Sequence, residues 1–225
     1  MRVGYLFVGI LLLVLATSVG YAAELNPVVQ DWLSAQTNIQ TWTADVTQIR
    51  TFKTLSQPLT STGHVWFAAP NRFRWEIKNP LPTIAVRQPD HVLVIYPRLK
   101  RAERYPLTGE RTGPWKETLA LLEAGFPGSR AELESRFRIF SQSREDDVYQ
   151  IMLQPKAAAA RRMMPEIRIA FSTKDFMLRA TELQFTDGSR IRNEFSNAKL
   201  NPRLEENLFT PRLDGDYRIV EPLAK

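Results

Sequence analysis

The sequence predicts a mainly β protein built on a large, curved antiparallel sheet with a few short helices. Two observations predict this fold class. Beyond residue 40, most of the chain consists of short runs in which apolar and polar side chains alternate, as in strands that bury one face. Pro, Asn, Asp or Gly separates most of these runs, which is the composition of turns. A sheet of roughly ten or eleven strands twists and curls, so its apolar face becomes concave.

The first 22 residues have the pattern of a secretory signal peptide. Arg2 supplies a positive start, and an apolar run from Tyr5 to Ala16 leads to small residues at a cut site near Ala22. This run is shorter than the ~20 residues that span a bilayer, which favours a cleaved signal peptide over a retained anchor. The sequence contains no cysteine, which excludes disulfides and a lipid-bearing N-terminal cysteine. We therefore expect a periplasmic protein that is soluble after cleavage.

Residues 23–225 are expected to form a single domain, because no Gly/Ser-rich linker or repeat divides them, and we expect a monomer. Of the 30 basic side chains only Arg2 lies in the leader, so 29 remain against 24 acidic ones, a net charge of about +5. Basic residues cluster at 98–104 and at Arg161 and Arg162. No nucleic-acid-binding motif accompanies them, so we expect no nucleic-acid partner. Docking to an anionic membrane surface or an acidic partner, and a merely solvated basic surface, both stay open.

The helices are predicted from their start signals. Asn26 is a good N-cap and Pro27 suits the first helical position, so an amphipathic helix is expected to about residue 40. A second helix is expected over residues 115–124, and Ser129 caps a third that ends near Arg136. These helices would cover the concave face of the sheet.

The strands are predicted from alternation with a period of two. The clearest hairpin signal is Asp187-Gly188, which separates two alternating runs. A short segment over residues 207–220 ends the chain. Strands are expected over residues 41–52, 63–68, 72–78, 82–88, 91–96, 101–106, 137–142, 147–154, 165–172, 176–186 and 189–199.

Motifs for catalysis are missing from the sequence. The two histidines, His64 and His91, stand in no metal-ligand spacing, and we expect them at the surface or rim and in a turn, respectively. Asp146 and Asp147 are adjacent carboxylates in what reads as a solvated turn. There is no nucleophile elbow, phosphate-binding loop or dinucleotide fingerprint. We therefore expect neither enzymatic activity nor a cofactor or metal.

The stretch APNRFRWEIKNP, residues 69–80, shows the alternation most clearly. Phe73, Trp75 and Ile77 fall on one face of the expected strand, and Arg72 and Arg74 fall on the other. Taken alone, such an apolar face is more often closed core than the lining of a ligand site.

The ordered motifs resemble the periplasmic outer-membrane lipoprotein carrier family (LolA-like) over almost the whole chain after the leader. The order and spacing of the motifs, rather than any one of them, carry the resemblance. They are the first helix, TWTADVTQ (41–48), GHVWFAAPNRFRWE (63–76), VLVIYP (92–97), the short helical insert, LQPK (153–156), FTDGSRIRNEF (185–195) and NLFTP (207–211).

This resemblance implies an incomplete, curved β-barrel whose helices act as a lid over an apolar cavity. The cavity would bind the acyl chains of a lipoprotein, or of another acylated lipid, and carry them from an inner-membrane release complex to an outer-membrane acceptor. On this reading the cavity residues are Trp32, Leu33, Trp66, Phe73, Trp75, Ile84, Val86, Val94, Tyr96, Ile151, Leu153, Ile167, Ile169, Phe171, Leu183 and Phe185, and the lid residues are Leu119, Leu122 and Phe126.

One departure from the family pattern concerns the lid. The residue before Pro70-Asn71 is commonly an arginine that latches the lid in the family, and it is Ala69 here. This difference suggests a divergent member that closes differently or carries a different lipid. A periplasmic sensor or regulatory module of the same fold, which recognises lipoproteins or envelope lipids, is the alternative function.

Overall fold

The computed structural model describes residues 26–107 and 125–222. The expected signal peptide, and the helix expected over residues 115–124 with Leu119 and Leu122, lie outside the described residues. Within the described ranges, no helix combines the length and the apolar character needed to span a bilayer.

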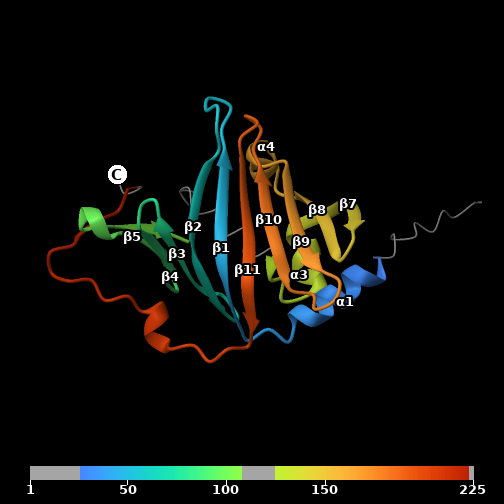
Figure 1. The fold of residues 1–225 in the computed structure, drawn as a ribbon, viewed down its shortest axis with the longest axis horizontal. Helices are drawn as coiled ribbons and strands as arrows, with labels where there is room; N and C mark the ends of the chain where they lie inside the picture. Colours follow the sequence, from blue (N-terminus) through green and yellow to red (C-terminus); the bar gives the residue numbers. More distant parts are fainter. Residues whose placement is uncertain (1–25, 108–124, 223–225) are drawn as a thin grey trace, which may run out of the picture.

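Twelve strands of the described chain form one curved sheet that does not close into a barrel (Figure 1). Their order across the sheet is β12-β6-β5-β4-β3-β2-β1-β11-β10-β9-β8-β7, and all neighbours pair antiparallel except β12 and β6. The strands are β1 (Thr41–Thr51), β2 (Leu59–Ala68), β3 (Arg72–Asn79), β4 (Thr83–Arg87), β5 (His91–Tyr96), β6 (Arg101–Pro106), β7 (Phe137–Glu145), β8 (Val148–Pro155), β9 (Glu166–Ser172), β10 (Leu178–Gln184), β11 (Arg190–Leu200) and β12 (Arg218–Val220).

The described helices are short, and local capping sets the ends of two of them. The helices are α1 (Pro27–Gln36), α3 (Arg130–Arg136) and α4 (Ala158–Met163), with 3-10 turns η1 (Pro97–Leu99) and η2 (Glu206–Phe209). The Asn26 side chain accepts a hydrogen bond from Val28 N and so caps α1, and the Ser129 side chain accepts one from Glu132 N and caps α3.

The main hydrophobic core lies between the inner face of the sheet and helices α1 and α3. Trp32 of α1 stacks on Phe171 of β9 with ring centroids 4.8 Å apart, and Leu133 of α3 is also buried there. Trp42, Val65, Trp75 and other alternate strand residues complete this core from the sheet. The first helix is therefore fixed to the second half of the sheet, across the concave face.

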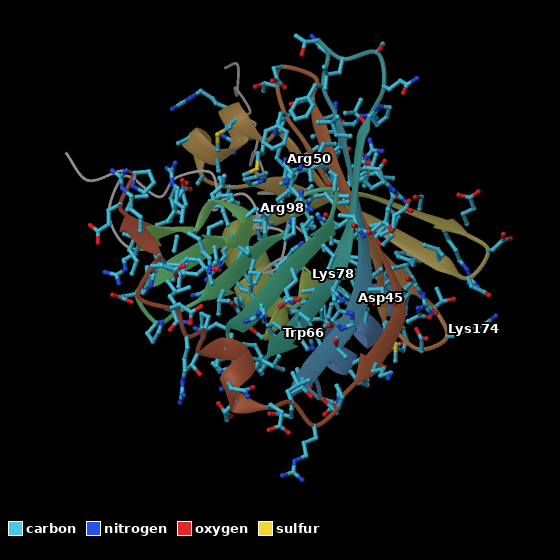
Figure 2. All side chains as sticks on the ribbon, turned by 60° about the vertical axis from the view of Figure 1, so that its left-hand side comes forward. Asp45, Arg50, Trp66, Lys78, Arg98 and Lys174 are labelled. Carbon is cyan, nitrogen blue, oxygen red and sulfur yellow. The ribbon has the colours of Figure 1, made fainter. Side chains whose placement is uncertain are left out.

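The outer face of the sheet has two parts. Over β1–β3 it carries charged side chains such as Asp45 and Lys78, together with the aromatic ring of Trp66 (Figure 2). Over β4–β6 the C-terminal segment covers a second, smaller apolar cluster of Leu93, Ile95 and Ala102. The Phe209 main-chain oxygen accepts a hydrogen bond from the Gln88 side chain at 2.7 Å, which anchors this segment.

The predicted elements agree with the structure except in a few places. All eleven expected strands are present within a few residues of their expected ends, and β12 adds a twelfth. The first helix ends at Gln36 rather than near residue 40, and α4 was not expected. The Asp187-Gly188 turn joins β10 and β11 as predicted, with Gly188 at a φ of 86°.

Candidate functional site

A pocket of about 380 Å³ opens on the inner side, where the ends of β2, β3 and β4 meet the loop after α1 and the segment that leads into α3. Its volume is at the lower end of the range of small-molecule pockets, ~300–1,000 Å³. The lining residues are Gln36, Thr37, Ile39, Gln40, Phe67, Ala69, Pro70, Asn71, Phe73, Arg87, Phe126, Pro127, Gly128, Glu132 and Arg136.

Aromatic rings form the floor of this pocket. Strand pairing sets Trp42 opposite Phe67 and Phe67 opposite Phe73, so one row of large rings crosses three strands on the inner face. Phe126, in the segment before α3, stacks on Phe67 with centroids 4.6 Å apart and an interplanar angle of 9°, and it touches Trp42 at 5.0 Å. The floor therefore joins the main core to the pocket without a polar break.

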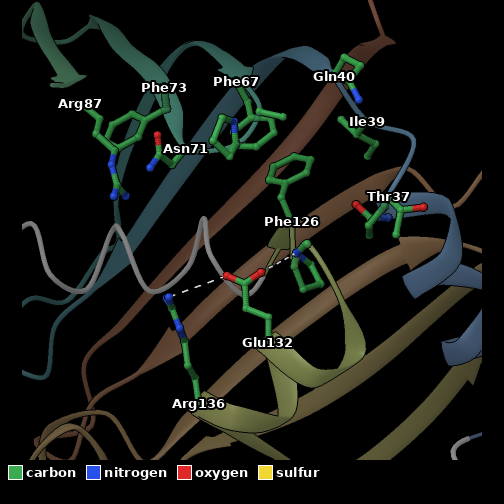
Figure 3. A pocket seen from close by; sticks show the side chains of 15 residues that line it. Thr37, Ile39, Gln40, Phe67, Asn71, Phe73, Arg87, Phe126, Glu132 and Arg136 are labelled. Atoms are coloured by element: carbon green, nitrogen blue, oxygen red, sulfur yellow. Dashed lines mark hydrogen bonds and ion pairs between the residues drawn. The ribbon is translucent and has the colours of Figure 1, made fainter. Parts of the chain in front are cut away.

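Charged and amide side chains form the rim (Figure 3). Arg87 follows the row of rings on β4, because the Arg74–Val86 pairing extends by one step to bring Arg87 beside Phe73. From the opposite side α3 contributes Glu132 and Arg136, whose Oε1 and Nη2 atoms are 3.8 Å apart. The pocket can thus accept an apolar chain on its floor while its mouth stays hydrated.

The loop that leads into α3 is positioned by its own hydrogen bonds. Glu132 Oε2 accepts one from Gly128 N at 3.1 Å, and Ser129 Oγ accepts one from Glu132 N at 3.1 Å. This reciprocal cap holds the backbone that carries Phe126 and Pro127 against the sheet.

Among the expected cavity residues, the structure places Phe73 directly in the pocket wall, and Phe126 of the expected lid lies beside it. Most of the others lie in the main hydrophobic core, and Tyr96 and Phe185 are half-buried and pack against that core. The core members are Trp32, Leu33, Trp75, Val94, Ile151, Leu153, Ile167, Ile169, Phe171 and Leu183.

Three of the expected cavity residues lie on the outer face instead. Trp66 packs beside His64, with ring centroids 4.3 Å apart, on the opposite side of β2 from Phe67. Ile84 packs on the outer apolar cluster, and alternation along β4 places Val86 on the same side. We therefore exclude all three from the pocket and from the main core.

Sequence reasoning missed Phe67, Ile39 and Arg87 as pocket residues. For Phe67 the sequence held a signal. A short turn separates it from Phe73, and as the neighbour of Trp66 it faces the opposite side of the strand from Trp66. For Arg87 there was none in the strand pattern, since its place depends on the pairing of β3 with β4.

A buried carboxylate, Glu103, lies on the inner face of β6, the same side as Tyr105. Its Oε2 accepts hydrogen bonds from the hydroxyls of Tyr105 at 2.6 Å and Tyr96 at 3.2 Å, and its Oε1 lies 2.5 Å from Arg101 Nη2. Burial, together with the bond to Glu103, raises the pKa of Tyr105 well above its ordinary value. All these groups are partnered, so the cluster holds β5 to β6 and offers no open ligand site.

A second polar cluster, on the outer face, joins Asp45, His64 and Thr43. Asp45 Oδ1 lies 2.7 Å from His64 Nδ1, and His64 Nε2 contacts the Thr43 hydroxyl. The order resembles a carboxylate–imidazole–hydroxyl relay. However, Thr43 is buried and its hydroxyl donates to Val65 O at 3.0 Å, so it is not a nucleophile. Within the described part of the chain, no three His, Asp or Glu side chains gather as a metal site.

Comparisons with known proteins identify a family model and relatives that match this chain. The model of the family "Outer membrane lipoprotein carrier protein LolA" matches residues 37–212 of the 225. The outer-membrane lipoprotein carrier protein of Dechloromonas aromatica is 25% identical over 181 residues, which cover 80% of this chain and 81% of that protein. The carrier of Chromohalobacter salexigens is 25% identical over 148 residues, 66% of this chain and 65% of that protein.

A solved structure extends the likeness at the level of fold. An uncharacterized conserved protein from Thermus thermophilus superposes with a TM-score of 0.52 at 12% identity, covering 86% of this chain and 98% of that one. The family match extends from the end of α1 to the C-terminal segment on the outer face, and it includes every described residue that lines the pocket except Gln36. The chain therefore belongs to the LolA family of outer-membrane lipoprotein carrier proteins.

Proposed function

We propose that this chain is a periplasmic carrier that binds the acyl chains of a lipoprotein, or of another acylated lipid, in the pocket floored by Phe67, Phe73 and Phe126. The observation that carries the proposal is the continuity of this aromatic floor with the main core on the concave face. Family membership and the two named relatives support a lipoprotein as the cargo.

The physical reason for such a pocket is the cost of exposing acyl chains to water. Each CH₂ group removed from water contributes roughly 0.8 kcal/mol, so a long chain crosses an aqueous compartment only inside an apolar container. A carrier must also release its cargo, and aromatic contacts without a dense set of hydrogen bonds suit release. No bond of the cargo changes, so the role needs no catalytic group. The donor would be an inner-membrane release complex and the acceptor an outer-membrane receptor.

The first experiment measures the binding of a fluorescent long-chain acyl probe to the delipidated protein. We compare Phe67→Ser with Trp66→Ser, adjacent aromatic residues on opposite faces of β2. The expected result is that Phe67→Ser weakens probe binding about tenfold or more, since it removes a large apolar contact. Trp66→Ser should leave binding unchanged. Equal effects of the two variants, or no binding by the parent protein, would overturn the proposal.

A transfer experiment separates the carrier from the sensor of the same fold. Inner-membrane vesicles that contain a labelled lipoprotein are incubated with the protein and then with outer-membrane vesicles. A carrier increases the label in the acceptor vesicles with repeated turnover. A sensor extracts at most one equivalent and does not pass it on.

A further inference from the structure

Three segments that are far apart in the sequence meet at one end of the sheet. They are the β1–β2 hairpin with its flanking residues (50–59), helix α4 (Ala158–Met163) and the β10–β11 turn (186–190), which Figure 1 shows together at the top. Thr186 N donates to Met163 O and Thr186 Oγ1 to Arg162 O, both at 3.1 Å. The Lys53 side chain reaches Gly188, where an added Cβ would be 2.5 Å from Lys53 Cε. We call these residues the tip surface.

Large apolar side chains are exposed on the tip surface. Phe52, Leu55 and Leu59 of the hairpin are 36%, 44% and 50% exposed, and Met163 of α4 is 40% exposed. A single exposed Leu on a protein surface is ordinary. Four such side chains on adjoining, protruding segments indicate an interaction surface. They provide apolar area at an end of the molecule that is accessible to a flat partner.

The same segments carry several basic side chains. Lys53, Arg161, Arg162 and Arg190 are exposed, and none forms an ion pair within 4 Å in the described part of the chain. Arg50 is not one of them, because its Nε donates to Gln48 Oε1 at 2.7 Å on the inner face of β1. Arg161 instead donates to the main-chain oxygens of Pro155 and Lys156, which orients its guanidinium and leaves its charge unbalanced.

The acidic groups nearby are few. Asp187, in the β10–β11 turn, accepts hydrogen bonds from Ser189 that lower its pKa, and the charge of Lys53 lowers it further. Asp187 is therefore anionic at neutral pH and offsets part of the charge of Lys53. Glu166, just beyond α4, contacts Arg168 on the outer face and is balanced there. By contrast, Arg74, Arg168 and Arg192 on the outer face of the sheet each have a carboxylate partner. The tip surface therefore carries excess positive charge.

We propose that the tip surface docks onto an anionic phospholipid bilayer. Apolar side chains that enter the interface, with lysine and arginine at headgroup level, are the combination that binds peripheral proteins to such membranes. A protruding hairpin matches a flat, deformable surface. This assignment gives Arg161 and Arg162 a role, and it is independent of the ligand that the pocket binds.

Docking at the tip surface also sets the orientation of the pocket. β1 has 11 residues, and the tip surface lies at its end whereas Trp42, beside the pocket floor, lies at its start. At about 3.3 Å per residue the two ends are roughly 30 Å apart. The docked protein therefore holds its pocket mouth away from the bilayer, where a partner in the aqueous phase reaches it.

The test is co-sedimentation of the exported chain with vesicles of phosphatidylethanolamine and phosphatidylglycerol, against vesicles of phosphatidylcholine alone. We expect binding to the anionic vesicles that weakens at high salt. Arg161→Gln with Arg162→Gln should lower the partition coefficient about tenfold or more, as should Phe52→Ser with Leu55→Ser. The matched control is Arg138→Gln with Arg144→Gln, exposed β7 arginines without carboxylate partners, which should bind like the parent.

A second readout locates the hairpin directly. Leu55→Trp should show fluorescence quenched by lipids brominated on their acyl chains, whereas Leu99→Trp, an exposed apolar site of η1, should not. Equal binding to both vesicle types, no binding at low salt, or equal loss in the β7 control would overturn the proposal. A protein that ignores vesicles but retains an acidic protein partner would overturn it as well.

Discussion

The ring of Phe126 lies flat on the ring of Phe67, with centroids 4.6 Å apart, and so attaches the segment before α3 to the inner face of β2. This contact connects the loop that forms one wall of the pocket with the strand that forms its floor. Because Phe126 is half-buried whereas Phe67 is buried, the loop ring is the more easily displaced partner. An incoming acyl chain would contact Phe67 by replacing it.

Phe126→Ala tests this relationship. Removing the ring loses a stacked pair worth ~0.5–1.5 kcal/mol and part of the apolar wall. We expect a modest loss of stability, about 1–3 kcal/mol, and a shift in tryptophan emission through Trp42, which Phe126 contacts. Urea unfolding measures the first effect and emission spectra the second. Phe140→Ala, exposed on β7, serves as the control and should change neither.

Trp75→Glu should prevent folding rather than block ligand binding selectively. Trp75 is buried, 4% exposed, and meets Phe195 edge-on with centroids 6.2 Å apart. An unpaired carboxylate in such a site costs several kcal/mol, about 3–5 kcal/mol by analogy with broken buried ion pairs. Circular dichroism and thermal unfolding should show the loss, and Trp75→Phe should retain the fold. A folded Trp75→Glu protein would show that this core admits water.

Gly63→Ala should destabilise the sheet by about 3 kcal/mol. A Cβ on Gly63 would lie 1.8 Å from the main-chain oxygen of Glu76, at the point where the β2–β3 register shifts. Main-chain atoms in a ladder do not move aside as a flexible side chain does. Gly215→Ala is the matched control, since a Cβ there meets nothing within 4 Å. Equal stabilities of the two variants in urea would contradict the prediction.

The Asp45 cluster should make stability depend on pH in the acid range. Hydrogen bonds from Asn197 and then from His64 lower the pKa of Asp45 below its ordinary 3.8. A carboxyl whose pKa is lower in the folded state stabilises the fold above its unfolded pKa, and that stabilisation is lost as the pH falls through the folded pKa. The stability difference between the parent and Asp45→Asn should therefore be full above about pH 4 and shrink below it. Asn197→Gly removes one of these hydrogen bonds and keeps the left-handed backbone at φ 51°. The stability of this variant should therefore vary less with pH in the acid range than that of the parent. Urea titrations across this range measure both.

Much of the fold could be predicted because its strands show their pattern locally. The run from Arg72 to Asn79 alternates so regularly that its bounds and its inner face, with Phe73 and Trp75, follow from the sequence. Helix α4 could not be predicted, since it has six residues and no side-chain cap. The short β12 depends on parallel pairing with a strand more than a hundred residues earlier, which no local pattern reveals.

The pocket was harder to predict than the sheet. Trp66 and Phe67 are both aromatic, so alternation cannot choose which one faces inward, and only the pairing of Phe67 with Phe73 decides. On β4 both faces are apolar, because the C-terminal segment covers the outer one, and Ile84 therefore resembles an inner residue. Ala69, at the position where the resemblance implied a lid arginine, does line the pocket, and Arg87 reaches the same space from β4.

The two edges of the sheet, β7 and β12, do not pair with each other in the described structure. A closed barrel has a diameter set by its strand number and stagger, because a continuous belt of hydrogen bonds resists expansion. An unclosed sheet has no such belt. Small changes of twist along its length can widen or narrow the concave side while every ladder bond survives. The width of the concave interior can thus change at low energetic cost, and one fold can accommodate ligands of different thickness.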